Sequence, residues 1–131
     1  RYAPVCGNVN NPTAGSYEWY MTEFIKTAQA KGATPILVTT VIGMKAYSGG
    51  KFVNSYSNYC DACKSLASKY NVPCIDLNTL MVNHYNSIGY NAALLYHLMG
   101  YPRAVILPMY MGLRDNFDEV FVSLVIFCKE D

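Results

Sequence analysis

The feature that most limits the fold of this chain is residues 16–41, SYEWYMTEFIKTAQAKGATPILVTTV. Ser16 is placed to cap a helix, because its side-chain oxygen can accept a hydrogen bond from a free N–H of the first turn. Gly32 stands where a left-handed residue ends such a helix. The helix should present one apolar face, made of residues at three- and four-residue steps: Tyr17, Tyr20, Met21, Phe24, Ile25 and Ala28.

A buried strand follows this helix. Ile36, Leu37 and Val38 form an apolar run without alternation. A strand that is apolar on both faces has to be covered on both faces, as in a parallel sheet. Residues 16–41 are therefore predicted to be a helix and a buried strand of an α/β sandwich.

The same alternation continues along the chain. The predicted elements are a strand end over 1–6, a site-bearing loop over 7–15, a flexible loop over 42–52, a helix over 54–70 stopped by Asn71, an edge strand over 72–76, a helix over 79–88 and a further helix over 91–99. Strands and helices in this order imply right-handed crossovers and a parallel sheet. The last stretch favours a helix over a strand, from the spacing of Phe117, Val120, Phe121, Leu124, Val125 and Cys128.

Composition excludes several classes of protein. A length of 131 residues predicts one domain over 1–131, and 52 % hydrophobic with 15 % charged residues is typical of a folded globular chain. The net charge of +1 gives no reason to expect binding to nucleic acid or to an anionic membrane surface. No apolar run approaches the roughly 20 residues of a membrane span.

The five cysteines are few and not densely spaced. Cys60 and Cys63 form a Cys-x-x-Cys motif inside the helical pattern, and a zinc site would need a second such pair. We interpret them as thiols packed in the core, with a metal or redox role as the alternative. The cysteines leave the cellular compartment open.

Two longer stretches, EFIKTAQAKGATPILVTTV and SNYCDACKSLASKYNVPCIDLNTLMVNHYNSIG, resemble the SGNH (GDSL-type) hydrolases, in particular the rhamnogalacturonan-acetylesterase-like branch. The resemblance covers about residues 14–100. It implies a three-layer α/β/α sandwich with a parallel, flavodoxin-like sheet, here truncated because the segment with the nucleophilic serine is missing. It implies hydrolysis of O-acetyl esters on plant cell-wall polysaccharide, no cofactor, no metal and an extracellular location.

The family uses a serine in a Gly-Asp-Ser-Leu-like motif, an oxyanion hole with a glycine and an asparagine, and an Asp-x-x-His near the C-terminus. The serine motif is absent from these 131 residues. By the resemblance, Gly7, Asn8 and Asn10 are the candidates for the oxyanion hole, and the alternative is that the asparagines are turn residues. Asp115 matches the aspartate, but no histidine stands three positions after it.

The two histidines are His84 and His97. A histidine on the apolar side of a helix is more simply a packed residue than a base, which is our interpretation of His84. His97 lies near a helix end, so it is the better candidate for a catalytic base.

Twelve tyrosines are many for a chain of this length. Most follow helical spacing and should edge the core. Tyr47, Tyr101 and Tyr110 fall in predicted loops, which makes them candidates for stacking against sugar rings.

Two functional hypotheses follow. The chain is an incomplete or degenerate carbohydrate acetylesterase with little activity of its own, or it is a non-catalytic module that binds glycan or a partner. A flavodoxin-like nucleotide binder is weaker, because no Gly-rich phosphate loop is present. Loss of a first strand would also leave an open sheet edge, so a homo-oligomer is expected along it.

Overall fold

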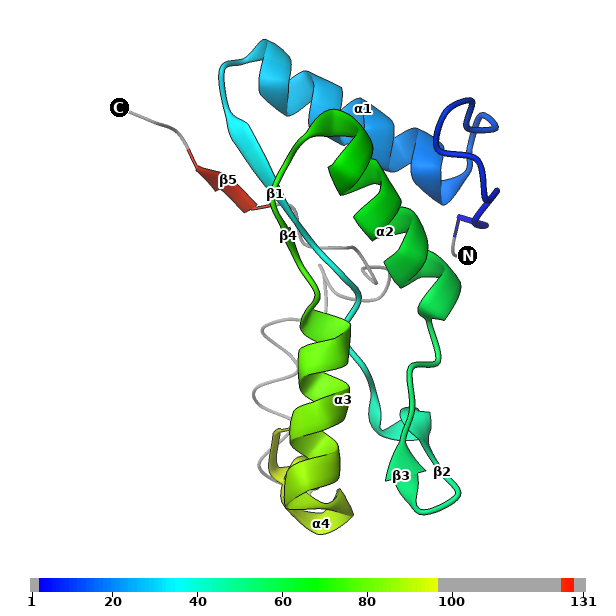
Figure 1. Cartoon of the computed structure of the whole chain (residues 1–131), viewed down its shortest axis with the longest axis vertical. Helices are drawn as coiled ribbons and strands as arrows, with labels where there is room; N and C mark the ends of the chain where they lie inside the picture. The colour runs from blue at the N-terminus through cyan, green and yellow to red at the C-terminus, as the bar shows by residue number, and fades with distance from the viewer. Residues whose placement is uncertain (1–2, 97–125, 129–131) are drawn as a thin grey trace, which may run out of the picture.

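A computed structural model describes residues 3–96 and 126–128 (Figure 1). The elements are α1 (Tyr17–Ala30), β1 (Thr34–Val38), η1 (Met44–Ala46), β2 (Tyr47–Ser48), β3 (Lys51–Phe52), α2 (Ser57–Tyr70), β4 (Cys74–Ile75), α3 (Leu77–Ile88), α4 (Tyr90–Ala93), η2 (Leu94–Tyr96) and β5 (Ile126–Cys128). Helices and strands alternate through the first part of the chain, so the α/β class is confirmed.

The main sheet has the order β4-β1-β5. β1 and β4 pair in parallel, with Leu37 opposite Cys74 and Val38 opposite Ile75, which confirms the predicted direction. β5 pairs antiparallel on the other side of β1, with Thr34 opposite Cys128. The sheet is therefore mixed rather than wholly parallel.

The helix predicted for the end of the chain is wrong at residues 126–128, which form β5. Isoleucine and phenylalanine favour a strand, and β1 offers free backbone groups on that side for a ladder. The other residues on which that prediction rested lie outside the described part.

Helix α1 has the predicted ends but a rotated buried face. The Ser16 Oγ accepts from the Trp19 N–H at 3.2 Å, and Gly32 takes a φ of +73°. Tyr20 and Phe24, predicted to be on the apolar face, are 46 % and 49 % exposed. The buried arc instead includes Glu18 and Thr22. The helix is turned this way because Glu18 has partners in the preceding loop, described below.

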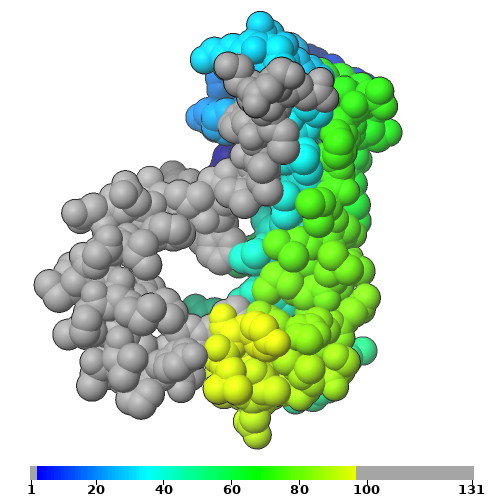
Figure 2. Space-filling model, turned by 90° about the vertical axis from the view of Figure 1, so that its left-hand side faces the viewer, coloured from blue at the N-terminus to red at the C-terminus, as the bar shows by residue number. Residues whose placement is uncertain are grey.

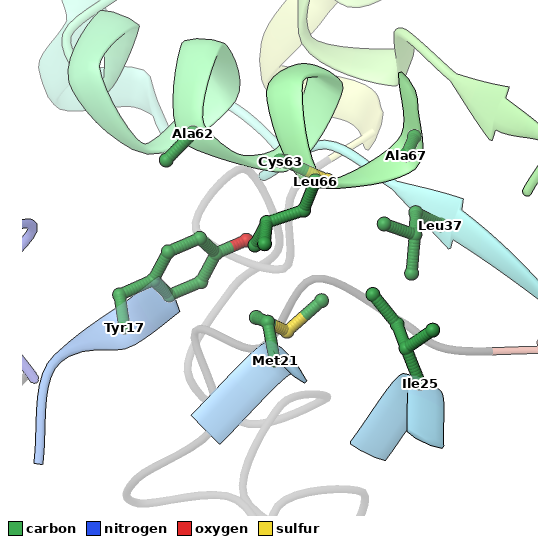
Figure 3. Close-up of a cluster of buried hydrophobic side chains, with 8 residues drawn as sticks. All are labelled: Tyr17, Met21, Ile25, Leu37, Ala62, Cys63, Leu66 and Ala67. Carbon is green, nitrogen blue, oxygen red and sulfur yellow. The ribbon is translucent and has the colours of Figure 1, made fainter. Parts of the chain in front are cut away.

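The largest core cluster lies where α1 and α2 pack on the same face of β1. Figure 3 shows Tyr17, Met21 and Ile25 of α1 pointing toward α2, with Leu37 of β1 beside them. The residues that α2 contributes are Ala62, Cys63, Leu66 and Ala67. This arrangement gives two layers, helices on a sheet, and the described residues do not confirm the third layer of the predicted sandwich.

Residues 42–52 are not the loop that we expected. Within this stretch, η1 leads into a hairpin in which Tyr47 pairs with Phe52 and Ser48 with Lys51. Gly49 and Gly50 supply the turn with φ values of +58° and +82°. A Gly-Gly pair between two short strands is a hairpin signal as well as a loop signal, and here the hairpin forms.

Residues 3–6 are not a strand either. The Pro4 carbonyl accepts from the Tyr17 N–H at 2.9 Å, and the Ala3 carbonyl accepts from the Tyr59 hydroxyl at 3.0 Å. Because these backbone groups bond to α1 and α2, they are not available for a sheet ladder.

The remaining helices lie close to their predicted bounds. α2 begins at Ser57 rather than at 54, and Asn71 takes the predicted left-handed stop with a φ of +51°. α3 begins at Leu77 with Asp76 as its cap, and Gly89 ends it. The helix predicted over 91–99 is divided between α4 and η2 up to residue 96, and the rest of it lies outside the described residues.

The described elements form an elongated body. Figures 1 and 2 show α1 and α2 at one end and α3 with α4 at the other, with the hairpin beside α3 in Figure 1. None of the described helices is long and apolar enough to cross a bilayer.

Replacing Leu66 by alanine tests the core. Its side chain has no exposed surface, so the change should lower the free energy of unfolding by about 3 kcal/mol. Leu80 on α3 is 59 % exposed, and Leu80→Ala should change it by less than about 0.5 kcal/mol. Urea denaturation followed by circular dichroism measures both, and equal losses would contradict this description of the core.

Candidate functional site

Polar side chains gather where the parallel strands β1 and β4 end. The Thr39 hydroxyl donates to the Asp76 Oδ1 at 3.2 Å and accepts from the Asn78 N–H at 3.0 Å. The Asn78 amide Nδ2 donates to the Thr40 carbonyl at 2.9 Å. The carboxyl ends of parallel strands are the common place for ligands in α/β folds. This strand-end cluster is thus the first candidate for a site.

Within the strand-end cluster, Asp76 is charged and Asn78 has spare bonding capacity. Burial alone would raise the pKa of Asp76, but bonds from the Thr79 N–H and hydroxyl, with Lys64, lower it below its ordinary value. The Lys64 Nζ lies 3.3 Å from the Asp76 Oδ2, and this contact raises the pKa of Lys64 against the opposing effect of burial. The Asn78 Oδ1 is buried with no hydrogen-bond partner among the described residues.

The loop after residue 5 is held by one buried carboxylate. Glu18 has no exposed surface; its Oε2 accepts from the Cys6 N–H at 2.9 Å and its Oε1 from the Gly7 N–H at 2.7 Å. Burial alone would raise the pKa of Glu18, but hydrogen bonds from backbone N–H groups outweigh burial and lower it. Glu18 is therefore an ionised anchor and not a proton acceptor near neutral pH.

A pocket of about 300 Å³ lies beside this loop. It is lined by Gly7 and Glu18 on one side and by Asn58, Asp61 and Ser65 of α2 on the other. The Lys69 Nζ donates to the Val9 carbonyl at 2.6 Å, so the loop is also fixed to α2. The pocket can admit a small polar group.

The three oxyanion-hole candidates lie together in this loop. The Gly7 N–H already donates to Glu18. The Asn8 Oδ1 accepts from the Asn10 N–H at 3.1 Å and from the Asn11 N–H at 3.0 Å, which is a turn closed by an asparagine side chain. These bonds fit the turn alternative for Asn8, and the oxyanion role of Gly7, Asn8 and Asn10 stays a prediction.

The acid–base candidates are largely beyond the described residues. Asp115 and His97 both lie outside them. The interpretation of His84 as a packed residue is wrong: it is exposed on α3, and its Nε2 lies 3.3 Å from the Tyr96 hydroxyl. The Ser87 hydroxyl donates to the His84 backbone carbonyl at 2.7 Å, but within residues 3–96 no serine hydroxyl is hydrogen-bonded to the His84 ring, so no serine–histidine pair is assembled there.

Of the three loop tyrosines, Tyr47 is described, whereas Tyr101 and Tyr110 lie outside the described residues. Tyr47 is 37 % exposed, and its ring lies 5.0 Å from that of Phe52 and 4.7 Å from that of Tyr90, centroid to centroid. The structure therefore places it in an aromatic cluster and not alone in a loop.

The cysteines of the Cys-x-x-Cys motif are packed. Cys60 is 1 % exposed with its sulfur 3.4 Å from the Thr40 hydroxyl, and Cys63 belongs to the α1–α2 core. Both are free thiols. In the described part of the chain, no three His, Cys, Asp or Glu side chains gather in a way that could hold a metal ion.

Two positioning residues were not recognised in the sequence. Glu18 is absent from the predicted buried face, although its steps to Met21 and Ile25 put it on that face, and a charged residue on such a face is a signal of a specific partner. Asn86 clamps Phe52: its Oδ1 accepts from the Phe52 N–H at 2.7 Å, and its Nδ2 donates to the Phe52 carbonyl at 2.9 Å. No sequence spacing indicates this contact.

Comparison with known proteins identifies two that are similar in sequence to part of this chain. It is 32 % identical over 84 residues to a protein of Bacillus subtilis (strain 168) named "Probable rhamnogalacturonan acetylesterase YesY", a match to 64 % of this chain and 38 % of that one. It is 37 % identical over 62 residues to rhamnogalacturonan acetylesterase RhgT of the same organism, a match to 47 % of this chain and 27 % of that one. This chain has a partial relationship to the rhamnogalacturonan acetylesterases.

The related segment is well under half of either acetylesterase. No protein-family model matches the chain, and no solved structure matches it. The relationship agrees with the resemblance to SGNH hydrolases.

Replacing Glu18 by glutamine tests the loop anchor. A glutamine has one oxygen for two N–H donors, so Glu18→Gln should cost about 1–3 kcal/mol of stability near pH 7. The folded-state pKa of Glu18 lies below the ordinary value of 4.5. Its ionised carboxylate therefore contributes fully to the free energy of unfolding above pH 4.5, and this contribution is lost as the pH falls through the folded-state pKa. The difference in unfolding free energy between wild type and variant should therefore shrink on acidification.

The matched control is Glu23→Gln, an exposed glutamate on the same helix. Urea titrations at several pH values measure both variants. Asp76 also has a lowered pKa, so part of the acid-side decline should remain in Glu18→Gln. A pH-independent difference between wild type and Glu18→Gln would show that the carboxylate charge does not hold the loop.

Proposed function

We propose that this chain is a portion of an SGNH-type carbohydrate O-acetylesterase that acts on acetylated plant cell-wall polysaccharide such as rhamnogalacturonan. The observation that carries the proposal is the 84-residue relationship to a probable rhamnogalacturonan acetylesterase. The parallel pairing of β1 with β4 supports it, because an SGNH hydrolase requires parallel strands whose carboxyl ends carry site residues.

The 131 residues alone are proposed to be catalytically weak. They contain no Gly-Asp-Ser-Leu-like motif, and Asp118 stands where a histidine would follow Asp115 in an Asp-x-x-His. Acyl transfer from an ester needs an activated hydroxyl and a base within hydrogen-bond reach. Gly7, Asn8 and Asn10 are retained as proposed donors to an oxyanion, with Asp115 and His97 as the proposed acid–base residues.

A second candidate function is a glycan-binding module without turnover. The exposed part of Tyr47, next to Tyr90, favours it, because exposed aromatic rings present large apolar faces with a polar hydroxyl at one end. Tyr101 and Tyr110 are proposed to add to the same kind of contact.

A calorimetric glycan titration separates these candidates, because saturable binding without turnover favours the binding module, and acetate release tests the proposed lack of activity. The purified 131-residue chain should hydrolyse p-nitrophenyl acetate no faster than the same chain unfolded in urea and diluted to an equal concentration. It should also release no acetate from acetylated rhamnogalacturonan oligosaccharides, while binding them saturably in a calorimetric titration. Enzymatic turnover by the chain would overturn its proposed inactivity. A flat titration, repeated with several acetylated glycans, would overturn the link to carbohydrate.

Self-association is proposed along an edge of the main sheet. In the described sheet β1 is flanked on both sides, and the edge strand β4 exposes 43 % of Ile75. Sedimentation velocity should show a concentration-dependent dimer that Ile75→Lys weakens, because a charge at a strand edge disfavours pairing. A monomer at every concentration would contradict this proposal.

A further inference from the structure

We propose that Cys63 of α2 and Cys74 of β4 form a redox-sensitive thiol pair, which closes to a disulfide under oxidising conditions and joins the helix to the edge of the main sheet. Among the cysteines that the structure describes, none is in a disulfide. The modification needs neither an ester nor a glycan, so the inference goes beyond the proposed acetylesterase function and does not rest on it. It also differs from the pairing within the Cys-x-x-Cys motif, because it takes one cysteine of the motif and a partner outside it.

The strand register places Cys74 on the face of the sheet that the helices cover. Leu37 and Cys74 lie opposite each other in the parallel pair of β1 and β4. Residues opposite each other on neighbouring strands point to the same face of a sheet. Leu37 points to the face covered by α1 and α2, where it belongs to the same core cluster as Cys63 (Figure 3). Cys74 therefore faces α2, and its side chain packs against this cluster.

Helix α2 can approach the sheet closely at this point. A disulfide usually needs the two Cα atoms to lie about 4.4–6.8 Å apart. Cys63 is fully buried, and the buried residues near it on α2 include Ala62 and Ala67, whose small side chains do not hold the helix away from the strand. α2 contacts β4 directly, and the Cys63 thiol forms a hydrogen bond with Cys74. The two thiols are thus neighbours before any oxidation takes place.

Access from solvent favours Cys74 as the first thiol to react. Cys60 and Cys63 are buried, whereas Cys74 is partly exposed in the edge strand of the described sheet. The Cys60 sulfur lies 3.4 Å from the Thr40 hydroxyl, so Cys60 already has a partner beyond the end of β1. A reagent in solution therefore meets Cys74 before either cysteine of the Cys-x-x-Cys motif.

The oxidant is a low-molecular-weight disulfide such as oxidised glutathione. The Cys74 thiolate attacks one of its sulfur atoms, which forms a mixed disulfide and releases one glutathione thiolate. The Cys63 thiolate then attacks the Cys74 sulfur, which forms the protein disulfide and releases the second glutathione thiolate. Two protein thiols are oxidised, one glutathione disulfide is reduced, and the two protons lost by the protein thiols pass to the two glutathione thiolates.

The pKa of Cys74 sets the pace of the first step. Burial raises this pKa, and the negative charges of Asp76 and of a Cys60 thiolate act in the same direction. The hydrogen bond from Cys63 and the ammonium of Lys64 oppose them, but the net pKa stays above the ordinary value of 9.0. Because the thiolate is the nucleophile, oxidation should be slow near neutral pH and faster as the pH rises toward 9.0.

The bridge would stabilise the connection between α2 and β4. It closes the short segment 64–73 into a covalent loop, which restricts the unfolded chain more than the folded one. Disulfides persist in oxidising compartments such as the extracellular space, which is the location expected from the family resemblance. In a reducing compartment the pair would stay as thiols.

Peptide mapping of the oxidised chain tests the pair. The reduced 131-residue chain is incubated with an excess of oxidised glutathione, remaining thiols are alkylated, and trypsin is added without a reductant. Trypsin cleaves after Lys64 and Lys69, so a Cys63–Cys74 bridge should join two peptides that are otherwise separate. The midpoint of urea unfolding should rise by about 1 M or more and should return to its first value with dithiothreitol. A bridge within the peptide that holds Cys60 and Cys63, a bridge from Cys74 to another cysteine, or a glutathione adduct that does not resolve would each overturn the proposal.

Variants of single cysteines assign the bridge. Cys63→Ala and Cys74→Ala should each lose the joined peptides and the rise in the urea midpoint. Cys74 is partly exposed, so its variant keeps the test valid if replacement of the buried Cys63 disturbs folding. The matched controls Cys60→Ser and Cys6→Ser should keep both effects, and Cys60→Ser retains a hydroxyl for Thr40. Circular dichroism of the reduced variants establishes that each is folded. Joined peptides in Cys74→Ala, or their loss in folded Cys60→Ser, would contradict the assignment.

The thiol pair and the acetylesterase proposal are judged by different measurements. The peptide map and the urea midpoint report on the bridge, whereas acetate release and glycan titration report on the proposed function. A chain that forms the bridge but binds no acetylated glycan would support the pair and count against the link to carbohydrate.

Discussion

The parallel pairing of β1 with β4 is the contact on which the rest of the described structure depends. Two strands can run in the same direction only if the connection between them crosses back over the sheet, and α2 provides that return. Leu37 of β1 is fully buried and lies opposite Cys74 in the parallel pair. Its side chain packs in the core cluster with residues of α1 and α2. Because both strands end at the same edge, Thr39 meets Asp76 and Asn78 there. The geometry of the strand-end cluster is a direct result of strand direction.

Outside this sheet, single polar side chains hold the irregular segments in place. Glu18 accepts from two N–H groups of the loop after residue 5, and Asn86 satisfies both backbone groups of Phe52. Burying a backbone N–H or C=O group without a hydrogen-bond partner costs free energy. A side chain that bonds to two such groups therefore holds a segment in place much as the hydrogen bonds between two short strands would. The candidate pocket and the aromatic cluster of Tyr47, Phe52 and Tyr90 lie on the two segments that are held in this way.

Local signals predicted a large part of this fold. The cap at Ser16 and the stops at Gly32 and Asn71 depend on a few adjacent residues, and all three are confirmed. Contacts between distant segments were not predictable: the rotation of α1 depends on Glu18 meeting residues 6 and 7, and β5 depends on a free side of β1. The candidate site was even harder to predict from the sequence than the fold. Tyr47 was found from its place in a presumed loop, whereas its neighbours Phe52 and Tyr90 are brought to it only by the hairpin and by α3.

The placement of β5 has a consequence for how the chain reaches its native state. Residues 39–125 separate β5 from its partner β1, whereas α1, β1, α2 and β4 follow one another closely. Closing a long loop costs more entropy than closing a short one, so contacts between near neighbours are expected to form first. Until β5 docks, that flank of β1 presents unpaired backbone groups to other molecules. The chain is thus expected to be most open to aggregation in the interval before β5 docks on β1.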